Sequence, residues 1–536
     1  MIKVTPLGGL GEIGSNMVCW NDGTTGFIID CGILFPYEEV FEINYLIPAF
    51  THLDKNFYKD IIITHAHEDH IGAIAHVVQW NPEITIHATN YTKHMIMKKL
   101  NELKLQSKFK DLDGETFKIR NWKITAVDIN HSTPETQCIV IAHPKYSISF
   151  CYASDFKINI SASDGLPFKP NKVKKLMSTY KLRMGMLDST NILNPGKTIE
   201  EAELIADLDA LFEKKGRCFI TFFTSNICRL NNIVKLAKKY HRPIVVLGRS
   251  VWNTIHVGIE SEVAKFEEDD FHEIDDLPNV NDENLLFIVS GCQGDFKSAL
   301  RRIAYREDPH VKLGQGDRFI FSSKVIPGNE DKIGRIYNKL AAQGAEIITA
   351  SDKLIHCSGH PGQEDLKIFL EGCDFTHYIP VHGETFFLHR HKAFIQQNYP
   401  HLAVQILNNS EELLIQEKED NHTIEVLPNS QWQDPKLYLN FHVEIERSQI
   451  SQRRKIANSG LVVLTMTDKR SNWKCTFYGL PLSLEGKRDW LLDQLFEFMQ
   501  KESKNKNSQE VFEQIRIKCR NLINTQIGTK PVCIVH

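Results

Sequence analysis

Short apolar runs in the first 160 residues predict a series of β-strands. They are "TTGFIIDCG" (24–32), "EITIHAT" (83–89), "WKITAVDIN" (122–130) and "YSISFCYASD" (146–155), with Gly, Asn and Asp at turn positions. Apolar residues at helical spacing lie between some of them, as in "TKHMIMKKLNELKL" (92–105). This part of the chain is therefore expected to be strand-rich α/β.

From about 206 to 350, apolar strands alternate with amphipathic helices. The strands are "GRCFITFF" (216–223), "RPIVVLG" (242–248), "NLLFIVSG" (284–291), "DRFIFSS" (317–323) and "AEIITA" (345–350). The helices between them are "RLNNIVKLAKKY" (229–240), "SALRRIAY" (298–305) and "DKIGRIYNKLAAQ" (331–343). Such alternation predicts a parallel sheet covered by helices.

Histidine- and glycine-rich turns return at 356–384 and resemble those of the first region. We therefore expect one discontinuous domain, 1–205 with 351–415, and an inserted domain, 206–350. The polar stretch 416–436, with two prolines, predicts a linker. Strand-like segments at 459–468 and 473–480 and helical spacing at 487–502 and 508–525 predict a small α+β domain over 437–536.

Composition adds limits on the class of protein. Hydrophobic residues make up 42% and charged residues 24% of the 536 residues, as in globular domains, and the net charge of −4 gives no overall basic bias for nucleic acid. The 12 cysteines include no C-x-x-C pair, which fits reduced thiols. Without a leader-like amino terminus or about 18 consecutive apolar residues, we expect a cytoplasmic protein that does not enter the membrane.

The segment "GLGEIG" (9–14) matches the G-x-G-x-x-G pattern of dinucleotide-binding turns. That fingerprint requires a helix after the last glycine, whereas the following "SNMVCW" is β-prone. The sequence favours a glycine-rich hairpin or bulge whose backbone approaches another segment closely.

The segment "DIIITHAHEDHIGAI" (60–74) predicts a strand, a loop and a helix, with potential metal ligands in the loop. Imidazole and carboxylate groups both suit zinc, and a cluster of this density suggests two ions. A lone histidine or aspartate is more often a turn or cap residue, but the H-x-H-x-D-H cluster is not explained that way. The candidate ligands, including three at distant apparent strand ends, are His65, His67, Asp69, His70, His131, Asp155 and His382.

Together with Asp30, these residues resemble the ligand pattern of the metallo-β-lactamase fold. "DSTN" (188–191), "CSGHPGQED" (357–365) and "IPVHGE" (379–384) resemble motifs A, B and C of β-CASP nucleases. "GGLGEIGSNM", "NHSTPE", "SDFK", "GCQGDFKSALRR", "FSSKVIPGNE" and "RRKIANSGLVVLT" further resemble bacterial ribonuclease J over nearly the whole chain. The resemblance implies an α/β fold: an αββα sandwich with an inserted β-CASP domain and a small carboxy-terminal domain.

The same resemblance assigns roles to the ligands. His65, His67 and His131 would hold one zinc, Asp69, His70 and His382 a second, and Asp155 would bridge them. Asp30 would orient a ligand from behind. Three departures from the family pattern concern substrate contacts: Cys228 replaces a histidine, Lys324 replaces an arginine, and Pro361 interrupts the loop of motif B.

Other residues are candidates for the chemistry and for substrate contacts. Asp69, Asp188 and His360 are expected to be catalytic, the last two by stabilising phosphate charge and protonating the leaving oxygen. The candidates for contact with substrate phosphates are Ser225, Asn226, Lys324, Ser358, Gly359 and His360. "GCQG" (291–294) precedes a predicted helix starting near Ser298, and basic clusters occur at 172–183, 297–306 and 451–455, although most such runs are solvated surface.

The expected function is that of a zinc-dependent ribonuclease acting on single-stranded RNA, 5′ to 3′ and internally, with preference for a 5′ monophosphate. Two Zn²⁺ per chain are expected, with Mn²⁺ or Mg²⁺ as alternatives that support activity. A homodimer or homotetramer and association with other RNA-decay proteins are the expected assemblies. The alternatives are a DNA-directed β-CASP nuclease, a hydrolase of a small ester, lactam or thioester, and a non-catalytic RNA-binding scaffold.

Overall fold

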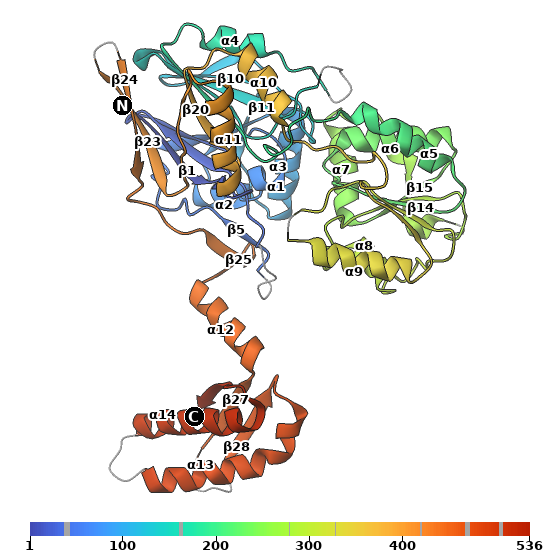
Figure 1. The fold of residues 1–536 in the computed structure, drawn as a ribbon, viewed down its shortest axis with the longest axis vertical. Coiled ribbons are helices and arrows are strands. Elements are labelled where there is room, and N and C mark those ends of the chain that lie inside the picture. Colours follow the sequence, from blue (N-terminus) through green and yellow to red (C-terminus); the bar gives the residue numbers. More distant parts are fainter. Residues whose placement is uncertain are drawn as a thin grey trace. The chain divides into compact units, whose positions relative to one another are not determined.

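The structure is a computed structural model that describes residues 1–36, 43–159, 165–277, 279–326, 328–418, 421–466, 472–502 and 508–536 (Figure 1). It divides into two compact units. Unit 1 comprises residues 1–35 and 46–435, and unit 2 comprises residues 36–45 and 436–536.

The first sheet of unit 1 has eight strands in the order β24-β23-β1-β3-β4-β6-β7-β8. In chain order they are β1 (Ile2–Gly8), β3 (Met17–Asn21), β4 (Gly26–Ile29), β6 (Tyr58–Ile62), β7 (Thr85–Ala88), β8 (Lys108–Asp111), β23 (Glu411–Lys418) and β24 (Asn421–Pro428). β4, β6, β7 and β8 are parallel to one another, and helices connect β6 to β7 and β7 to β8. These helices are α1 (Glu68–Ile71), α2 (Ile74–Trp80) and α3 (Asn90–Glu102).

The second sheet has seven strands in the order β22-β20-β13-β12-β11-β10-β9. They are β9 (Thr116–Ile119), β10 (Trp122–Asp128), β11 (Gln137–His143), β12 (Ile148–Ala153), β13 (Leu182–Asp188), β20 (His377–Val381) and β22 (Ala403–Val404). The accompanying helices are α4 (Pro170–Met177), α10 (Gln363–Gly372) and α11 (Thr385–Asn398). β13 and β20 pair in parallel although 188 residues, 189–376, lie between Asp188 and His377.

The two sheets pack face to face through one apolar core, in which Trp20 and Phe27 of the first sheet meet Trp122 and Phe150 of the second. A second core, containing Val173 of α4 and Phe369 of α10, covers the outer face of the second sheet. The predicted αββα sandwich is therefore confirmed, and the alternating strands of the sequence supply its two inner faces.

The chain leaves this sandwich after β13 and returns at α10, and the insertion between them contains a six-stranded parallel sheet. Its order is β16-β15-β17-β14-β18-β19, with β14 (Cys218–Thr221), β15 (Ile244–Leu247), β16 (Phe271–His272), β17 (Leu286–Val289), β18 (Arg318–Phe321) and β19 (Glu346–Ile348). Its helices are α5 (Ile205–Glu213), α6 (Ile227–Lys239), α7 (Arg249–Glu260), α8 (Ala299–Ala304) and α9 (Glu330–Ala341). α5 and α6 lie on one face of the sheet, and α8 and α9 lie on the other (Figure 1).

The glycine segment at 9–14 is not followed by a helix. It leads from β1 through β2 (Leu10–Gly11) directly into β3. β2 pairs with β21 (Gly383–Glu384), immediately after His382, and a Cβ at Gly8 would lie 1.9 Å from the carbonyl oxygen of Ser15. The predicted glycine-rich hairpin with close backbone approach is present, and the dinucleotide alternative is excluded.

Two segments differ from the sequence-based expectation. The linker predicted at 416–436 is wrong for residues 416–418 and 421–428, because β23 and β24 pair antiparallel and extend the first sheet beyond β1, and residues 419–420 lie outside the described residues. As an edge hairpin it buries only alternate residues such as Leu413 and Ile415, so most of its sequence is polar. The helix α7 was also not predicted, although the parallel pairing of β15 and β16 requires a crossover there.

Unit 2 is a small α+β unit built from β25 (Lys436–Asn440), β26 (Val443–Ile445), α12 (Arg447–Ser459), β27 (Leu461–Thr465), β28 (Lys474–Tyr478), α13 (Arg488–Glu502), α14 (Ser508–Ile527) and β29 (Val532–Val535). Residues 467–468, the end of one predicted strand, lie outside the described residues. β5 (Tyr45–Ile47) begins in this unit. Among the described helices, none has the length and apolar character needed to cross a membrane.

Candidate metal centre

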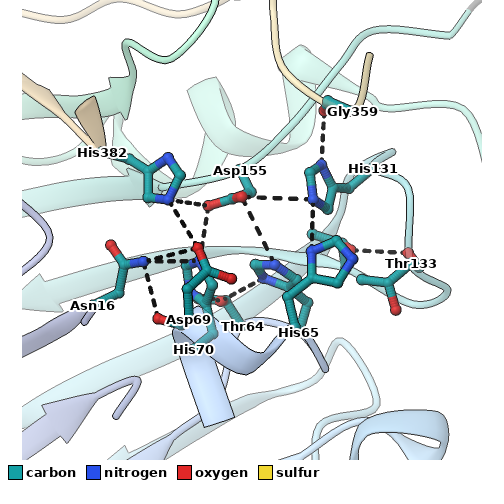
Figure 2. A network of polar contacts seen from close by, with 12 residues as sticks. Asn16, Thr64, His65, Asp69, His70, His131, Thr133, Asp155, Gly359 and His382 are labelled. Atoms are coloured by element: carbon teal, nitrogen blue, oxygen red, sulfur yellow. Dashed lines mark hydrogen bonds and ion pairs between the residues drawn. The ribbon is translucent and has the colours of Figure 1, made fainter. Parts of the chain in front are cut away.

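The candidate ligands stand just beyond the ends of strands from both sheets. His65 and His67 follow β6, His131 follows β10, Asp155 follows β12 and His382 follows β20. Since the strands end at one edge of the sandwich, their following loops converge there (Figure 2). His382 has the left-handed φ of 50°, an unfavourable conformation that aims its ring at the cluster.

The side chains form two groups that share Asp155. His65, His67 and His131 lie around one oxygen of Asp155, and Asp69, His70 and His382 lie around the other. Asp155 Oδ2 is 3.8 Å from His65 Nε2 and 3.5 Å from His131 Nε2. Its Oδ1 is 3.0 Å from His70 Nε2 and 3.5 Å from His382 Nε2 (Figure 2). The structure thus brings all seven candidate ligands together in the pairing that the resemblance implies.

Groups behind the rings fix their orientation. Asp30 Oδ2 lies 2.8 Å from His70 Nδ1, and Asp30 Oδ1 accepts the backbone N–H of Thr64 at 2.8 Å. The carbonyl of Gly359 accepts from His131 Nδ1 at 2.7 Å, and the hydroxyl of Thr190 lies 2.8 Å from His382 Nδ1. With the Nδ1 atoms donating outward, the Nε2 lone pairs of these rings point into the cluster.

The electrostatics of the cluster differ between its two halves. Burial lowers the pKa of His65 and of His131 well below the ordinary value, so these rings are neutral donors of the kind a metal requires. Burial also acts on His70, but the carboxylates of Asp155, Asp69 and Asp30 outweigh it and raise its pKa well above the ordinary value. Burial lowers the pKa of His382, but the carboxylates of Asp155, Asp188 and Asp69 outweigh it and raise the pKa to about 10.

The residues fit a pair of divalent metal ions. His65 Nε2 is a buried polar atom without a hydrogen-bond partner in the described part of the chain, and it faces the cluster. Unpartnered buried atoms of this kind are costly unless an ion satisfies them. Imidazole and carboxylate donors suit zinc, and four-donor groups that share one carboxylate suit two ions.

His360 lies at the border of the cluster. Its Nδ1 is 2.7 Å from Asp188 Oδ2 and 3.8 Å from Asp155 Oδ2, and its ring stacks on that of His382 with centroids 5.5 Å apart. Burial lowers the pKa of His360, but the carboxylate of Asp188 outweighs this, so its pKa is raised. Its side chain is 24% exposed, whereas Asp188 is fully buried, so His360 presents the accessible end of the pair.

The predicted substrate-contact residues have different surroundings. Ser225 Oγ lies 3.1 Å from His67 Nε2, which brings the insertion against the cluster. The Asn226 side chain is instead committed to structure: it caps α6 by accepting from Arg229 N and donates to Glu201. Lys324 is exposed, and its ammonium group makes no ion pair with the described residues.

The loop of motif B turns around small residues. Ser358 Oγ accepts from the backbone N–H of His360 at 3.1 Å. A Cβ at Gly359 would lie 2.6 Å from the His131 ring, so only glycine fits there. Of the remaining departures, Pro361 is buried just before the start of α10, and Cys228 is partly exposed in the first turn of α6.

Two features at the centre were not foreseen from the sequence. The amide of Asn16, two residues after the glycine segment, lies 3.0 Å from the carbonyl of Asp69 and 3.1 Å from His70 Nε2. The fully buried ion pair between Arg229 and Glu201 ties α6 to the segment by which the chain enters the insertion. Neither residue carries a local signal, because the contacts join segments far apart in the sequence.

Comparison with known proteins identifies the family. Residues 215–340 match the model "Ribonuclease J, beta-CASP domain", and residues 10–144 match "Metallo-beta-lactamase superfamily". Ribonuclease J of Sinorhizobium meliloti is 30% identical over 99% of this chain and 96% of its own length. The chain belongs to the ribonuclease J family.

Other relatives agree with this assignment. Ribonuclease J of Helicobacter pylori strain 26695 is 31% identical over 87% of this chain and 68% of its own length. Ribonuclease J of Synechocystis is 32% identical over 76% of this chain. The chain spans 65% of the length of that relative. A crystal structure of a protein of unknown function from Enterococcus faecalis V583 has the same fold, with a TM-score of 0.55 and 14% identity over 77% of this chain and 99% of that one. The family is one of metal-dependent nucleases, and the His/Asp cluster of this member is a ligand set for divalent metal.

Proposed function

We propose that the protein hydrolyses phosphodiester bonds of single-stranded RNA at a two-zinc centre, both from the 5′ end and internally. The observation that carries the proposal is the pair of ligand groups joined by Asp155, with the His360 and Asp188 pair at their border, in a chain of the ribonuclease J family. Mn²⁺ or Mg²⁺ is the alternative metal.

Zinc held by the two groups would supply Lewis acidity at the phosphoryl group and a water of lowered pKa as nucleophile. The protein's own contribution is position. Asp155 holds the two ligand groups against each other, and Asp30 orients His70 by accepting its Nδ1 proton. Asp69 contributes to the second group beside His382, 3.3 Å away.

His360 would face the scissile phosphate. Its partly exposed ring, oriented by Asp188, supplies a donor for a non-bridging oxygen or for the leaving 3′ oxygen. The 5′ phosphate of the strand would be held by Ser225, Ser358 and Lys324. Ser225 lies beside His67, and Lys324 offers an ammonium group that makes no ion pair with the described residues. Cytoplasmic RNA decay, a homo-oligomer and contacts with other RNA-decay proteins complete the proposal.

The test is digestion of one labelled single-stranded sequence as RNA and as DNA, with 5′ monophosphate and 5′ triphosphate ends, by protein loaded with zinc. We expect mononucleotides and internal fragments from RNA, faster release from the 5′ monophosphate, and little product from DNA. Elemental analysis should give about two zinc per chain, because seven ligands fit two ions of the catalytic type. Removal of the metal by a chelator should stop hydrolysis. RNA that stays intact at every metal tested, or equal digestion of DNA, would contradict the proposal.

A further inference from the structure

A second polar cavity lies in the inserted domain, outside the metal centre. Its volume is about 520 Å³, and it opens at the carboxyl ends of the neighbouring strands β15 and β17. Carboxyl ends of parallel strands are where α/β sheets bind ligands. The motifs "GCQG" and "KSALRRIAYR", which the metal centre does not use, form one side of it.

The lining of this cavity is cationic. Arg249, Lys297 and Arg302 face it, against the single carboxylate of Asp295. Arg302 lies 3.5 Å from Asp308, whereas Arg249 and Lys297, both exposed, form no ion pair with any residue that the structure describes. Two cations without anionic partners at the mouth of one cavity favour an anionic ligand.

The geometry of the strand ends adds hydroxyl groups. Ser250 and Ser290 also line the cavity. A Cβ at Gly248, which has φ of 134°, would lie 2.1 Å from Ser290 Oγ, so glycine is needed for the two strand ends to approach. Guanidinium, ammonium and hydroxyl donors around one space are the groups that hold a phosphate.

The cavity lies at the same edge of the parallel sheet as the loop that reaches the metal centre. The sheet order places β17 next to β14 and β15 one strand further, and strands lie about 4.8 Å apart. The loop after β14 carries Ser225 to within 3.1 Å of His67. A nucleic acid strand that leaves the cluster along this edge of the sheet therefore meets the cavity within one or two strand widths.

An exposed aromatic ring stands beside these cations in the chain. Phe296, between the lining residues Asp295 and Lys297, is 72% exposed, and the Arg301 guanidinium lies 4.4 Å from its ring centroid. Proteins that hold single strands combine cations for the backbone with aromatic rings on which bases stack. An exposed phenylalanine beside a cationic cavity has this pairing.

We propose that this cavity binds a backbone phosphate of the RNA strand away from the bond being cleaved, through Arg249 and Lys297, and that Phe296 stacks an adjacent base. The site rests on the proposed function, since it extends the same substrate's path. The group that the cavity would recognise is a phosphate. A free nucleotide also carries a phosphate, so the experiment has to distinguish it from the RNA strand.

The experiment measures equilibrium binding of a fluorescent 12-nucleotide single-stranded RNA to the full chain in chelator, over a series of salt concentrations. The test variant is Arg249→Ala/Lys297→Ala, and Phe296→Ala is measured beside it. The matched control is Lys235→Ala/Lys265→Ala, two exposed lysines of the same domain that make no ion pair with described residues and do not line the cavity.

We expect the test variant to lose about tenfold or more in affinity and its salt slope to fall by about 0.7 for each phosphate contact removed, while the control keeps both values. Phe296→Ala should lose affinity without changing the slope, because stacking releases no counterions. Zinc-loaded protein should cleave bis(p-nitrophenyl) phosphate equally well with and without the two alanines, because this substrate is too short to reach the cavity.

Equal RNA affinity of the test and control variants would overturn the proposal. A test variant that keeps RNA affinity but no longer binds uridine monophosphate or inorganic phosphate would overturn it in favour of a free-nucleotide site. Failure of the proposed function looks different, because it appears as wild-type protein that does not hydrolyse RNA, whereas these binding measurements need no hydrolysis.

Discussion

The carboxylate of Asp155 faces both ligand groups, with one oxygen toward His70 and the other toward His131. A buried anion in this position needs compensation, which the surrounding rings provide in part and bound metal ions would complete. His360 lies near the same carboxylate but points to Asp188 and toward solvent. Metal-ligating histidines and the substrate-facing His360 therefore lie in one cluster. Mutation distinguishes them, because a ligand variant loses zinc and activity whereas a substrate-facing variant loses activity alone.

Replacing His360 by alanine should lower the rate of RNA cleavage by about 10² to 10⁴ while zinc stays bound, because a positioned donor is lost and no ligand is. His67→Ala should lower both the rate and the zinc content. Elemental analysis and RNA cleavage on the same samples distinguish the two. If His360→Ala loses zinc in parallel with activity, or keeps near-native turnover, the role assigned to His360 is wrong.

Asp30 contacts His70 on the side of the ring that faces away from the cluster. Its backbone has a positive φ of 59°, an unfavourable conformation that the surrounding structure must stabilise. Replacing it by asparagine should weaken metal binding about 10- to 100-fold, because His70 loses the acceptor that orients its ring. Asp60→Asn is the matched control, since Asp60 pairs with His87 at the same 2.8 Å and neither residue is a candidate ligand. Zinc affinity measured by competition with a chelator checks this. Equal affinity of the two variants would refute the orienting role.

At the scale of the elements, one buried side chain joins the segments by which the chain enters and leaves the insertion to its sheet and helix α6. Arg229 of α6 donates to Glu201 before α5, to the carbonyl of Ser322 after β18 and to the carbonyl of Ile355, which begins the loop that carries His360. Two of these segments lead directly to proposed substrate contacts, Lys324 after Ser322 and Ser358 after Ile355. The pair therefore holds together the elements from which substrate contacts are proposed.

The stability supplied by this pair should depend on pH. Burial raises the pKa of Glu201, but Arg229 outweighs it and lowers the pKa to about 2 from the ordinary 4.5. The stabilisation is therefore fully present above pH 4.5 and disappears as pH falls toward 2.

Glu201→Gln should reduce the free energy of unfolding by about 3 to 5 kcal/mol at pH 7, because it leaves a buried guanidinium without its anion. The difference from the wild type should shrink as pH falls below 4.5, and denaturant titrations at several pH values measure it. Asp209→Asn, which breaks the exposed pair with Lys239, should leave stability unchanged. A difference that stays constant with pH would contradict the ionic role of Glu201.

The elements also show what a sequence reveals. The strand, loop and helix around His65 were predictable because an apolar run, a cluster of donors and a second apolar run occur in order. The parallel insertion was predictable because its strands are buried on both faces and read as continuous apolar runs. The hairpin of β23 and β24 was not, since an edge strand buries alternate residues and resembles a linker. The contacts of Asn16 and Arg229 were not either, because they depend on tertiary placement.

At the scale of the whole molecule, the metal centre, the cationic cavity of the inserted domain and the buried Arg229–Glu201 pair all belong to unit 1. Unit 2 contains none of the proposed chemical groups. Its sheet of β28, β27 and β29 packs one face against α13 and α14, through residues such as Val462 and Phe477. The opposite face includes Tyr478, 55% exposed, and Ile534, 41% exposed. An apolar sheet face left open in this way favours association with another molecule.

We therefore expect unit 2 to join copies of this chain through that open face. In the sheet, Leu461 lies opposite Tyr478 and Val463 opposite Ile534, so these side chains form one continuous surface. Tyr478→Lys/Ile534→Lys should lower the mass measured by light scattering toward the 61.5 kDa of one chain, because like charges would meet across the interface. Ile517→Lys, on α14 and 46% exposed, is the control and should keep the assembled mass. Both variants should retain zinc and cleave bis(p-nitrophenyl) phosphate, since the ligands lie in unit 1. A double variant with unchanged mass would exclude this face, and a wild-type protein of single-chain mass would exclude the homo-oligomer altogether.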